Sequence, residues 1–135
     1  MSDAKVELAR AGLDAWNRRD VDWLRDNATT DFEFVPAVAA TVEGGSVQGP
    51  EGMAHFFEEM DESWESFRLQ SEQFEPVGEV VLWRGRVTAK GRGSGLELDQ
   101  PIGSVMHFRD EKLARMQSYL DLDEARAAAQ AGGGI

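Results

Sequence analysis

Several carboxylate and imidazole side chains stand where they could act as acids or bases. Glu33 lies within the apolar stretch DFEFVPAV, and Asp99 shortly precedes Pro101. His107 lies within a predicted strand, and Asp121 follows the end of the next one. A carboxylate in an apolar pocket has a raised pKa and exchanges protons near neutral pH, and histidine titrates near pH ~6.5. The chemistry that these residues would support is general acid–base catalysis.

Each of these candidates also has a structural interpretation. The pattern Asp121-x-x-Glu124 is typical of a helix start, where an aspartate accepts hydrogen bonds from backbone N–H groups. His107 falls on the polar face of its strand, which favours a surface or interface role. A bulge at Pro36, or pairing with an arginine, would turn Glu33 away from a pocket. Asp99 could reach the mouth of a pocket, but its place before Pro101, where a strand would break, favours a loop.

Composition excludes several classes of function. The 135 residues carry a net charge of −11, which disfavours nucleic acid as a partner. Cysteine is absent and the two histidines are far apart, so we expect no disulfide, no zinc site and no cofactor. No apolar run reaches transmembrane length, and the N-terminal sequence MSDAKVELAR lacks a signal-peptide core. We therefore expect a cytoplasmic protein without a membrane partner. The preference for arginine over lysine is typical of a GC-rich bacterial genome.

The clearest strand pattern covers residues 103–120, GSVMHFRDEKLARMQSYL. It predicts two alternating strands joined by a turn at Asp110 and Glu111, where no glycine is present. An alternating strand over residues 79–90 precedes it. The glycine-rich segment 91–95, GRGSG, joins strand to strand and lacks the lysine of a phosphate-binding loop, so it is predicted to be a hairpin connection.

Helical spacing of apolar residues occurs in three places. Residues 4–18 and 21–27 are predicted to form two helices. A third helix begins at Pro50 and is predicted to run through Phe67. Its apolar positions are Met53, Phe56, Phe57, Met60, Trp64 and Phe67. Further strands are predicted over residues 31–38, 68–75, 96–109 and 112–120, a loop with a short strand near 46–48 over residues 39–49, and a last helix over residues 121–129.

This order of elements predicts a single α+β domain over residues 1–135. A curved, mostly antiparallel sheet wraps around the three N-terminal and central helices, and a short helix ends the chain. Such a sheet over three helices forms a cone that leaves a cavity.

Several short motifs in this order resemble one known family. They are WNRRD (16–20), DFE (31–33), QGPEG (48–52), GRGSG (91–95), FRD (108–110), YLD (119–121) and EA (124–125). With this spacing, nearly the whole chain resembles a SnoaL-like domain of the nuclear transport factor 2-like superfamily. The resemblance implies a cone with a pocket between sheet and helices, often dimerised through the outer sheet face. Members include polyketide cyclases, ketosteroid isomerases, dehydratases, epoxide hydrolases and proteins of no known activity, so the fold does not give the function.

The resemblance argues against ketosteroid isomerase activity. That reaction needs a base carboxylate, a tyrosine and a protonated aspartate. The corresponding positions hold Val35, Gly12 and Ser104. Because none of these residues can supply the required group, we reject this activity.

Two catalytic candidates remain after this comparison. The resemblance places Val35 at a pocket position, and unbroken alternation would then turn Glu33 inward as well. Polyketide cyclases of the family carry an acid/base aspartate near the position of Asp121. Glu33 and Asp121 are therefore the candidates for acid–base catalysis, with arginine pairing and helix capping as their respective alternatives.

The predicted pocket is apolar, with two serines as its polar groups on the last hairpin. Its predicted lining residues are Trp16, Phe34, Val35, Phe57, Trp83, Ser104, Met106, Met116, Ser118 and Leu120. We expect either a protein that binds a small hydrophobic molecule without established catalysis, or a cyclase-, isomerase- or dehydratase-like enzyme. A dimeric protein-interaction scaffold is the third possibility.

The outer sheet face carries a basic stripe, formed by Arg84, Arg86, Thr88 and Lys90. In an acidic protein, this stripe would pair with acidic residues of a second subunit or with sheet neighbours such as Glu97. The first alternative predicts a homodimer through the outer sheet face.

Overall fold

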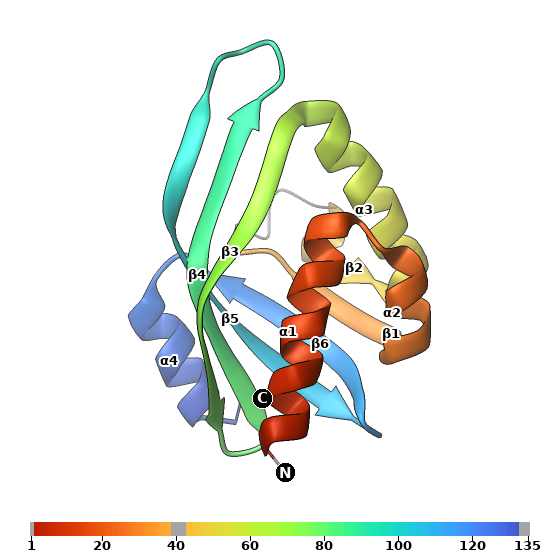
Figure 1. The fold of residues 1–135 in the computed structure, drawn as a ribbon, viewed down its shortest axis with the longest axis vertical. Helices are drawn as coiled ribbons and strands as arrows, with labels where there is room; N and C mark the ends of the chain where they lie inside the picture. The colour runs from red at the N-terminus through yellow and green to blue at the C-terminus, as the bar shows by residue number, and fades with distance from the viewer. Residues whose placement is uncertain (1, 39–42, 133–135) are drawn as a thin grey trace.

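The computed structural model of the protein describes residues 2–38 and 43–132. Within these residues the chain forms one curved six-stranded sheet and four α-helices (Figure 1), which confirms the predicted α+β fold. The strand order is β2-β1-β6-β5-β4-β3, antiparallel except for the pair β1 and β6. The strands are β1 (Ala28–Val35), β2 (Val47–Gln48), β3 (Trp64–Val77), β4 (Val80–Gly91), β5 (Glu97–Arg109) and β6 (Lys112–Tyr119).

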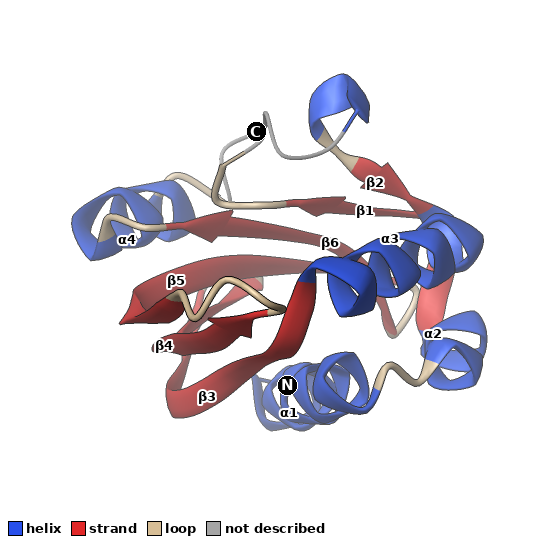
Figure 2. Cartoon of the chain, turned by 90° about the horizontal axis from the view of Figure 1, so that it is seen from above, coloured by secondary structure: helices blue, strands red, loops and turns tan. Residues whose placement is uncertain are grey.

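The helices cover both faces of this sheet. Three lie on the concave face and one packs on the convex face (Figure 2). The concave-face helices are α1 (Ser2–Arg18), α2 (Val21–Asn27) and α3 (Gly49–Ser63), and the convex-face helix is α4 (Leu122–Gln130). A short 3-10 helix, η2 (Glu43–Gly45), precedes β2, and residues 39–42 of the predicted loop lie outside the described residues.

Two apolar clusters follow from this arrangement. The main core joins Leu13 of α1 and Met53 of α3 to Trp83 on the inner face of the sheet. The smaller cluster packs Ala125 of α4 against Val105 on the convex face. Burial on both faces explains the continuous apolar run from Val80 to Trp83 in β4, whose side chains go alternately to the smaller cluster and to the main core.

The third helix is shorter than its apolar spacing predicted. It ends at Ser63, so the prediction of a helix through Phe67 was wrong. Trp64 pairs with Gly91 and Ser66 with Lys90, which leaves one extra residue in β3. Such a β-bulge puts residues three apart, here Trp64 and Phe67, on the same face of a strand. The spacing that imitated a helix is therefore produced by a bulged strand.

The ends of the first and last strands show how local chemistry sets their limits. β1 ends at Val35, directly before Pro36, since proline has no N–H to continue a ladder. The hairpin between β5 and β6 turns through Asp110 and Glu111, whose φ angles are 54° and 63°. Both residues adopt the left-handed conformation of a two-residue hairpin turn without the glycine that this turn prefers.

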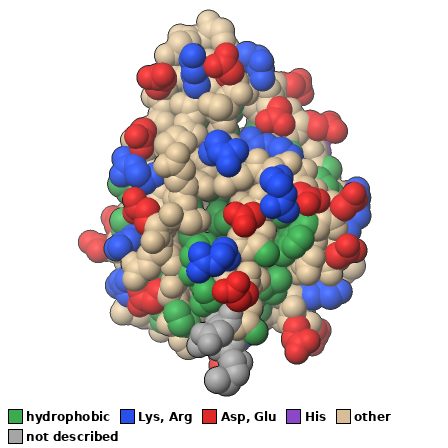
Figure 3. All heavy atoms as spheres, in the orientation of Figure 1, with side chains coloured by type: hydrophobic (Ala, Val, Ile, Leu, Met, Phe, Trp, Pro, Cys, Tyr) green, Lys and Arg blue, Asp and Glu red, His purple; other side chains and the backbone are tan. Residues whose placement is uncertain are grey.

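The surface carries charges of both signs. Figure 3 shows acidic and basic side chains interspersed over the face that carries α1 and α3. Many form local pairs; for example, Arg25 of α2 contacts Glu51 of α3 at 2.7 Å. No described helix has the length and the apolar composition needed to span a membrane.

Candidate functional site

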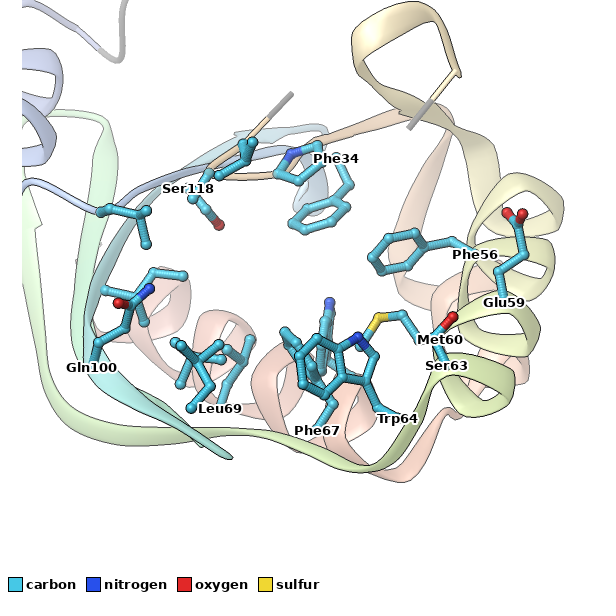
Figure 4. Close-up of a pocket in the computed structure, with 18 residues that line it drawn as sticks. Phe34, Phe56, Glu59, Met60, Ser63, Trp64, Phe67, Leu69, Gln100 and Ser118 are labelled. Carbon is cyan, nitrogen blue, oxygen red and sulfur yellow. The ribbon is translucent and has the colours of Figure 1, made fainter. Parts of the chain in front are cut away.

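A cavity of about 480 Å³ opens between the concave face of the sheet and helices α1 and α3 (Figure 4). Every long strand from β3 to β6 contributes to its wall, together with β1 and the segment that follows it. Its lining is mostly apolar: Trp16, Phe34, Pro36, Ala37, Val38, Phe56, Glu59, Met60, Ser63, Trp64, Phe67, Leu69, Val87, Leu98, Gln100, Ile102, Ser118 and Leu120.

Contacts between aromatic rings form one side of the cavity wall. Phe34 of β1 packs on Phe56 of α3 with ring centroids 5.3 Å apart. Phe67 of β3 lies between Trp16 and Trp64, at 5.8 and 5.5 Å. Aromatic side chains have few rotatable bonds and bury large areas, so contacts of this kind fix the shape of a wall. The cavity is therefore formed by the fold itself.

Polar groups are few and lie at particular places in this wall. The Gln100 side chain extends from β5 into the cavity (Figure 4). Ser118 Oγ lies 2.7 Å from Ser104 Oγ, and one of these buried hydroxyls donates to the other. Glu59 lies at the mouth, since 63% of its side chain is exposed. Such sparse polar groups orient a ligand in an otherwise apolar site.

Only part of the predicted lining is found at this cavity. Trp16, Phe34, Ser118 and Leu120 line it. The other predicted lining residues do not: Val35, Phe57, Trp83, Ser104, Met106 and Met116. All of these except Val35 are buried in the protein interior, because helices pack directly on the middle of the sheet and fill the space there.

Some lining residues were missed by the sequence interpretation. Trp64 and Phe67 were assigned to a helix, and Leu69 to a strand whose face was not determined. Leu98, Gln100 and Ile102 alternate in phase with Ser104, so extending that pattern towards the start of β5 would have found them. The sequence indicated the strand, but it did not indicate which positions along the strand line the cavity.

Glu33 lies on the opposite face of the sheet from the cavity. Phe34 points inward, so Glu33 and Val35 fall on the other side, which corrects the expectation that both face the pocket. Arg115 Nε donates to Glu33 Oε1 at 2.9 Å, and Gln48 Nε2 donates to Oε2 at 3.2 Å. The hydrogen bond from Arg115 lowers the pKa of Glu33. The structure therefore contains the arginine pair that was the alternative to a catalytic role for Glu33.

The remaining candidates are also engaged away from the cavity. Asp121 caps α4, its Oδ1 accepting hydrogen bonds from the backbone N–H groups of Asp123 at 2.8 Å and Glu124 at 3.2 Å. Asp99 accepts a hydrogen bond from Arg86 Nε at 2.7 Å. His107 pairs with Arg115 in the β5–β6 ladder, on the convex side. None of these side chains lines the cavity.

Glu33→Gln is expected to leave ligand binding unchanged and to alter the acid sensitivity of folding. The pKa of Glu33 is lowered in the folded state, so its ionised form adds stability above its unfolded pKa of ~4.3, and this is lost as pH falls through the folded value. About a third of each partner is exposed, so the loss at pH 7 should stay below ~1 kcal/mol. Urea unfolding from about pH 7 to pH 3 should show that the free energies of unfolding of wild type and variant converge as the pH falls. A difference in free energy of unfolding that grows as the pH falls would contradict the pairing of Glu33 with Arg115.

No group of three or more histidine, aspartate or glutamate side chains that could hold a metal ion occurs among the described residues. The cavity thus offers an apolar surface, the amide of Gln100 and the hydroxyls of Ser63 and Ser118, and among its described lining residues Glu59 is the one ionisable group.

Comparison with known families places this site in context. A family model for the SnoaL-like domain matches residues 9–116. The chain belongs to the SnoaL-like domain family. The comparison with curated protein sequences finds no match.

Solved structures share the fold of this SnoaL-like domain at low sequence identity. A nuclear transport factor 2-like protein of unknown function from Burkholderia pseudomallei K96243 is 17% identical over 90% of this chain and 93% of its own, with a TM-score of 0.75. A protein from Jannaschia sp. CCS1 named as a SnoaL-like polyketide cyclase is 22% identical over 96% and 93%, with a TM-score of 0.72. TerC, co-crystallised with polyporic acid, is 19% identical over 94% and 98%, with a TM-score of 0.74. At these identities the likeness shows the fold.

Proposed function

We propose that this SnoaL-like domain binds a small hydrophobic molecule in the cavity between sheet and helices. The observation that carries the proposal is a preformed hollow of about 480 Å³ with an aromatic and aliphatic wall. Ligand sites are typically apolar hollows of roughly 300–1,000 Å³ with a few oriented polar groups. The co-crystal of the structural neighbour TerC with polyporic acid supports a ligand-binding use of this fold.

The arrangement of ionisable groups favours binding over acid–base catalysis. General acid–base catalysis needs a titratable group within hydrogen-bonding reach of the substrate. Glu33 and Asp121 are committed to Arg115 and to the start of α4. Glu59 lies on α3 at the mouth of the cavity, with 63% of its side chain exposed to solvent. The enzyme alternative therefore has no catalytic group in place among the described lining residues.

The predicted homodimer has less support from the basic stripe than the sequence suggested. Arg86 pairs with Asp99 at 2.7 Å and Lys90 with Glu65 at 3.3 Å within the same chain. These two charges are neutralised by sheet neighbours and require no second subunit. The homodimer through the convex face stays a prediction.

Nile red, a neutral dye whose emission rises in apolar surroundings, tests the proposed binding. Val87 lines the cavity and is 2% exposed, so Val87→Phe places a ring in the hollow. Thr88→Phe makes a similar enlargement on the opposite face of the same strand and serves as the matched control. We expect saturable binding to wild type, a loss of affinity of at least about tenfold in Val87→Phe, and no change in Thr88→Phe.

Near-ultraviolet circular dichroism establishes that both variants keep the native packing. Equal dye affinity in folded Val87→Phe and wild type would place the dye outside the cavity and refute the proposed site. Absence of saturable binding to wild type would count against the proposed function as a whole.

A further inference from the structure

The wall of the cavity contains a hydrogen-bond donor that the protein does not use. Trp16 of α1 lines the cavity and is only 5% exposed. Its Nε1 is buried and has no acceptor among the described atoms. The indole N–H is a donor only, and buried tryptophans usually find a partner for it. A donor without an acceptor on a residue that lines a cavity is open to an acceptor from a water or from a ligand in that cavity.

Trp83 provides the comparison within the same fold. It is 0% exposed, and its indole Nε1 donates to Ser71 Oγ at 2.9 Å. Ser71 of the edge strand β3 thus provides an acceptor for one buried indole, whereas no described atom provides one for Trp16. Both rings belong to the main core cluster, but Trp16 also lines the cavity and Trp83 does not.

The ring of Trp16 is held in place by its neighbours. The Phe57 ring meets it nearly edge-on, at 5.7 Å and 86°, and Phe67 lies 5.8 Å away. The Arg19 guanidinium lies over the Trp16 ring at 5.0 Å, and its Nη1 donates to the Trp16 carbonyl oxygen at 3.1 Å. Turning the indole towards another acceptor would break these contacts. The donor is therefore preorganised, which lowers the cost of binding an acceptor.

The described wall also indicates the charge of the ligand. It contains no lysine or arginine, and Glu59 lies at its mouth. An anionic ligand would bury its charge without a partner, which is costly in an apolar site. A neutral ligand with an acceptor oxygen avoids this cost and satisfies the indole.

We propose that Trp16 is a specificity-determining residue, whose indole N–H selects neutral, apolar ligands that carry a carbonyl-type acceptor oxygen. This inference rests on the proposed function and adds the chemical class of the ligand. The aromatic side chains Phe34, Phe56 and Trp64 contact the apolar body, and Trp16 binds the oxygen.

Fluorene and fluorenone form a matched pair of probes, because they share one flat skeleton and differ by the carbonyl oxygen. Their affinities are measured by displacement of Nile red from wild type, Trp16→Phe and the control Trp64→Phe. Trp64 also lines the cavity, so the control makes the same change in ring type at a second position. The readout is the ratio of fluorenone affinity to fluorene affinity, in which the general effect of a smaller ring cancels.

We expect Trp16→Phe to lower this ratio about fivefold, the size of one modest hydrogen bond, and Trp64→Phe to leave it unchanged. In wild type, fluorenone but not fluorene should move the Trp16 indole N–H resonance downfield, a readout that does not depend on folding of the variant. An unchanged ratio in folded Trp16→Phe, or an unmoved resonance at saturation, would overturn the inference while binding of both probes upholds the proposed function. Failure of both probes to displace bound Nile red from wild type would also overturn the inference, whereas the proposed function fails only if Nile red itself does not bind.

Discussion

Gly85→Ala is expected to lower the free energy of unfolding by about 3 kcal/mol, although it adds a single methyl group. Gly85 lies on the inner face of β4, next to the side chain of Trp83. A Cβ atom there would overlap the backbone oxygen of Gln70 on β3 and lie 2.6 Å from Trp83 Cζ2. Side chains can turn away from such a clash, but a strand backbone can move only by shifting its ladder.

The local bulge explains why this position is so crowded. The pairing of β3 with β4 shifts register between Ser71 and Gln73, directly opposite Gly85. The Trp83 indole donates to Ser71 Oγ at 2.9 Å, which holds the ring in place beside Gly85. Glycine is required here because another backbone approaches closely, a common reason for glycine within a strand.

Gly12→Ala is the matched control for this substitution. Gly12 lies within α1, and an added Cβ would meet Leu113 Cδ2 at 3.5 Å, an ordinary contact. Alanine favours a helix over glycine by roughly 0.5–1 kcal/mol, so this variant should be more stable than wild type. Urea unfolding followed by tryptophan fluorescence measures both changes. If Gly85→Ala unfolds at the same urea concentration as wild type, this would contradict the close approach of β3 and β4.

The sequence predicted the fold well where one period continued without interruption. Alternation located the strands around residues 79–120, and helical spacing located the third helix as far as Met60. It failed at Trp64 and Phe67 because the β-bulge is fixed by pairing with Gly91 and Lys90, distant in the chain. The spacing of neighbouring residues cannot predict a strand register that is set by pairing with a distant strand.

The candidate site was less predictable than the fold, for a related reason. The alternation in DFEFV has two possible phases, and only tertiary contacts choose between them. Phe34 packs on Phe56 at 5.3 Å, while Glu33 meets Arg115 on the other face at 2.9 Å. The division of inward residues between core and cavity also depends on where the helices lie, which leaves Trp83 fully buried although it faces the same side as the cavity.

Asn17→Ala is expected to destabilise the protein by about 2 kcal/mol and to weaken ligand binding. Asn17, at the end of α1, binds both backbone groups of Leu69: Nδ2 donates to the carbonyl oxygen and Oδ1 accepts from the N–H, each at 2.9 Å. β3 is an edge strand, so this amide takes the place of a neighbouring strand. Leu69 lines the cavity and Asn17 adjoins Trp16, so the same clamp holds two walls of the site together.

Arg18→Ala is the control for Asn17→Ala, because Arg18 is the next residue of α1 and its side chain is 56% exposed. Its pair with Asp20 lies at the surface, so we expect a change below about 0.5 kcal/mol and unaltered Nile red binding. Equal stability of the two variants in urea would show that the clamp on Leu69 contributes little.

Asn17→Asp tests the direction of the hydrogen bonds in this clamp. An ionised aspartate still accepts from the Leu69 N–H, but it places a carboxylate oxygen against the Leu69 carbonyl, where the amide donated at 2.9 Å. Repulsion there favours the protonated acid, whose O–H restores the donor, so the pKa of the new side chain should be raised in the folded state. A raised folded pKa adds stability below the unfolded value of ~3.9, and this is lost as pH rises through the folded pKa. The variant should therefore be about as unstable as Asn17→Ala at pH 7 and recover relative to it in acid, whereas a constant difference across pH would mean that Asn17 does not donate to Leu69.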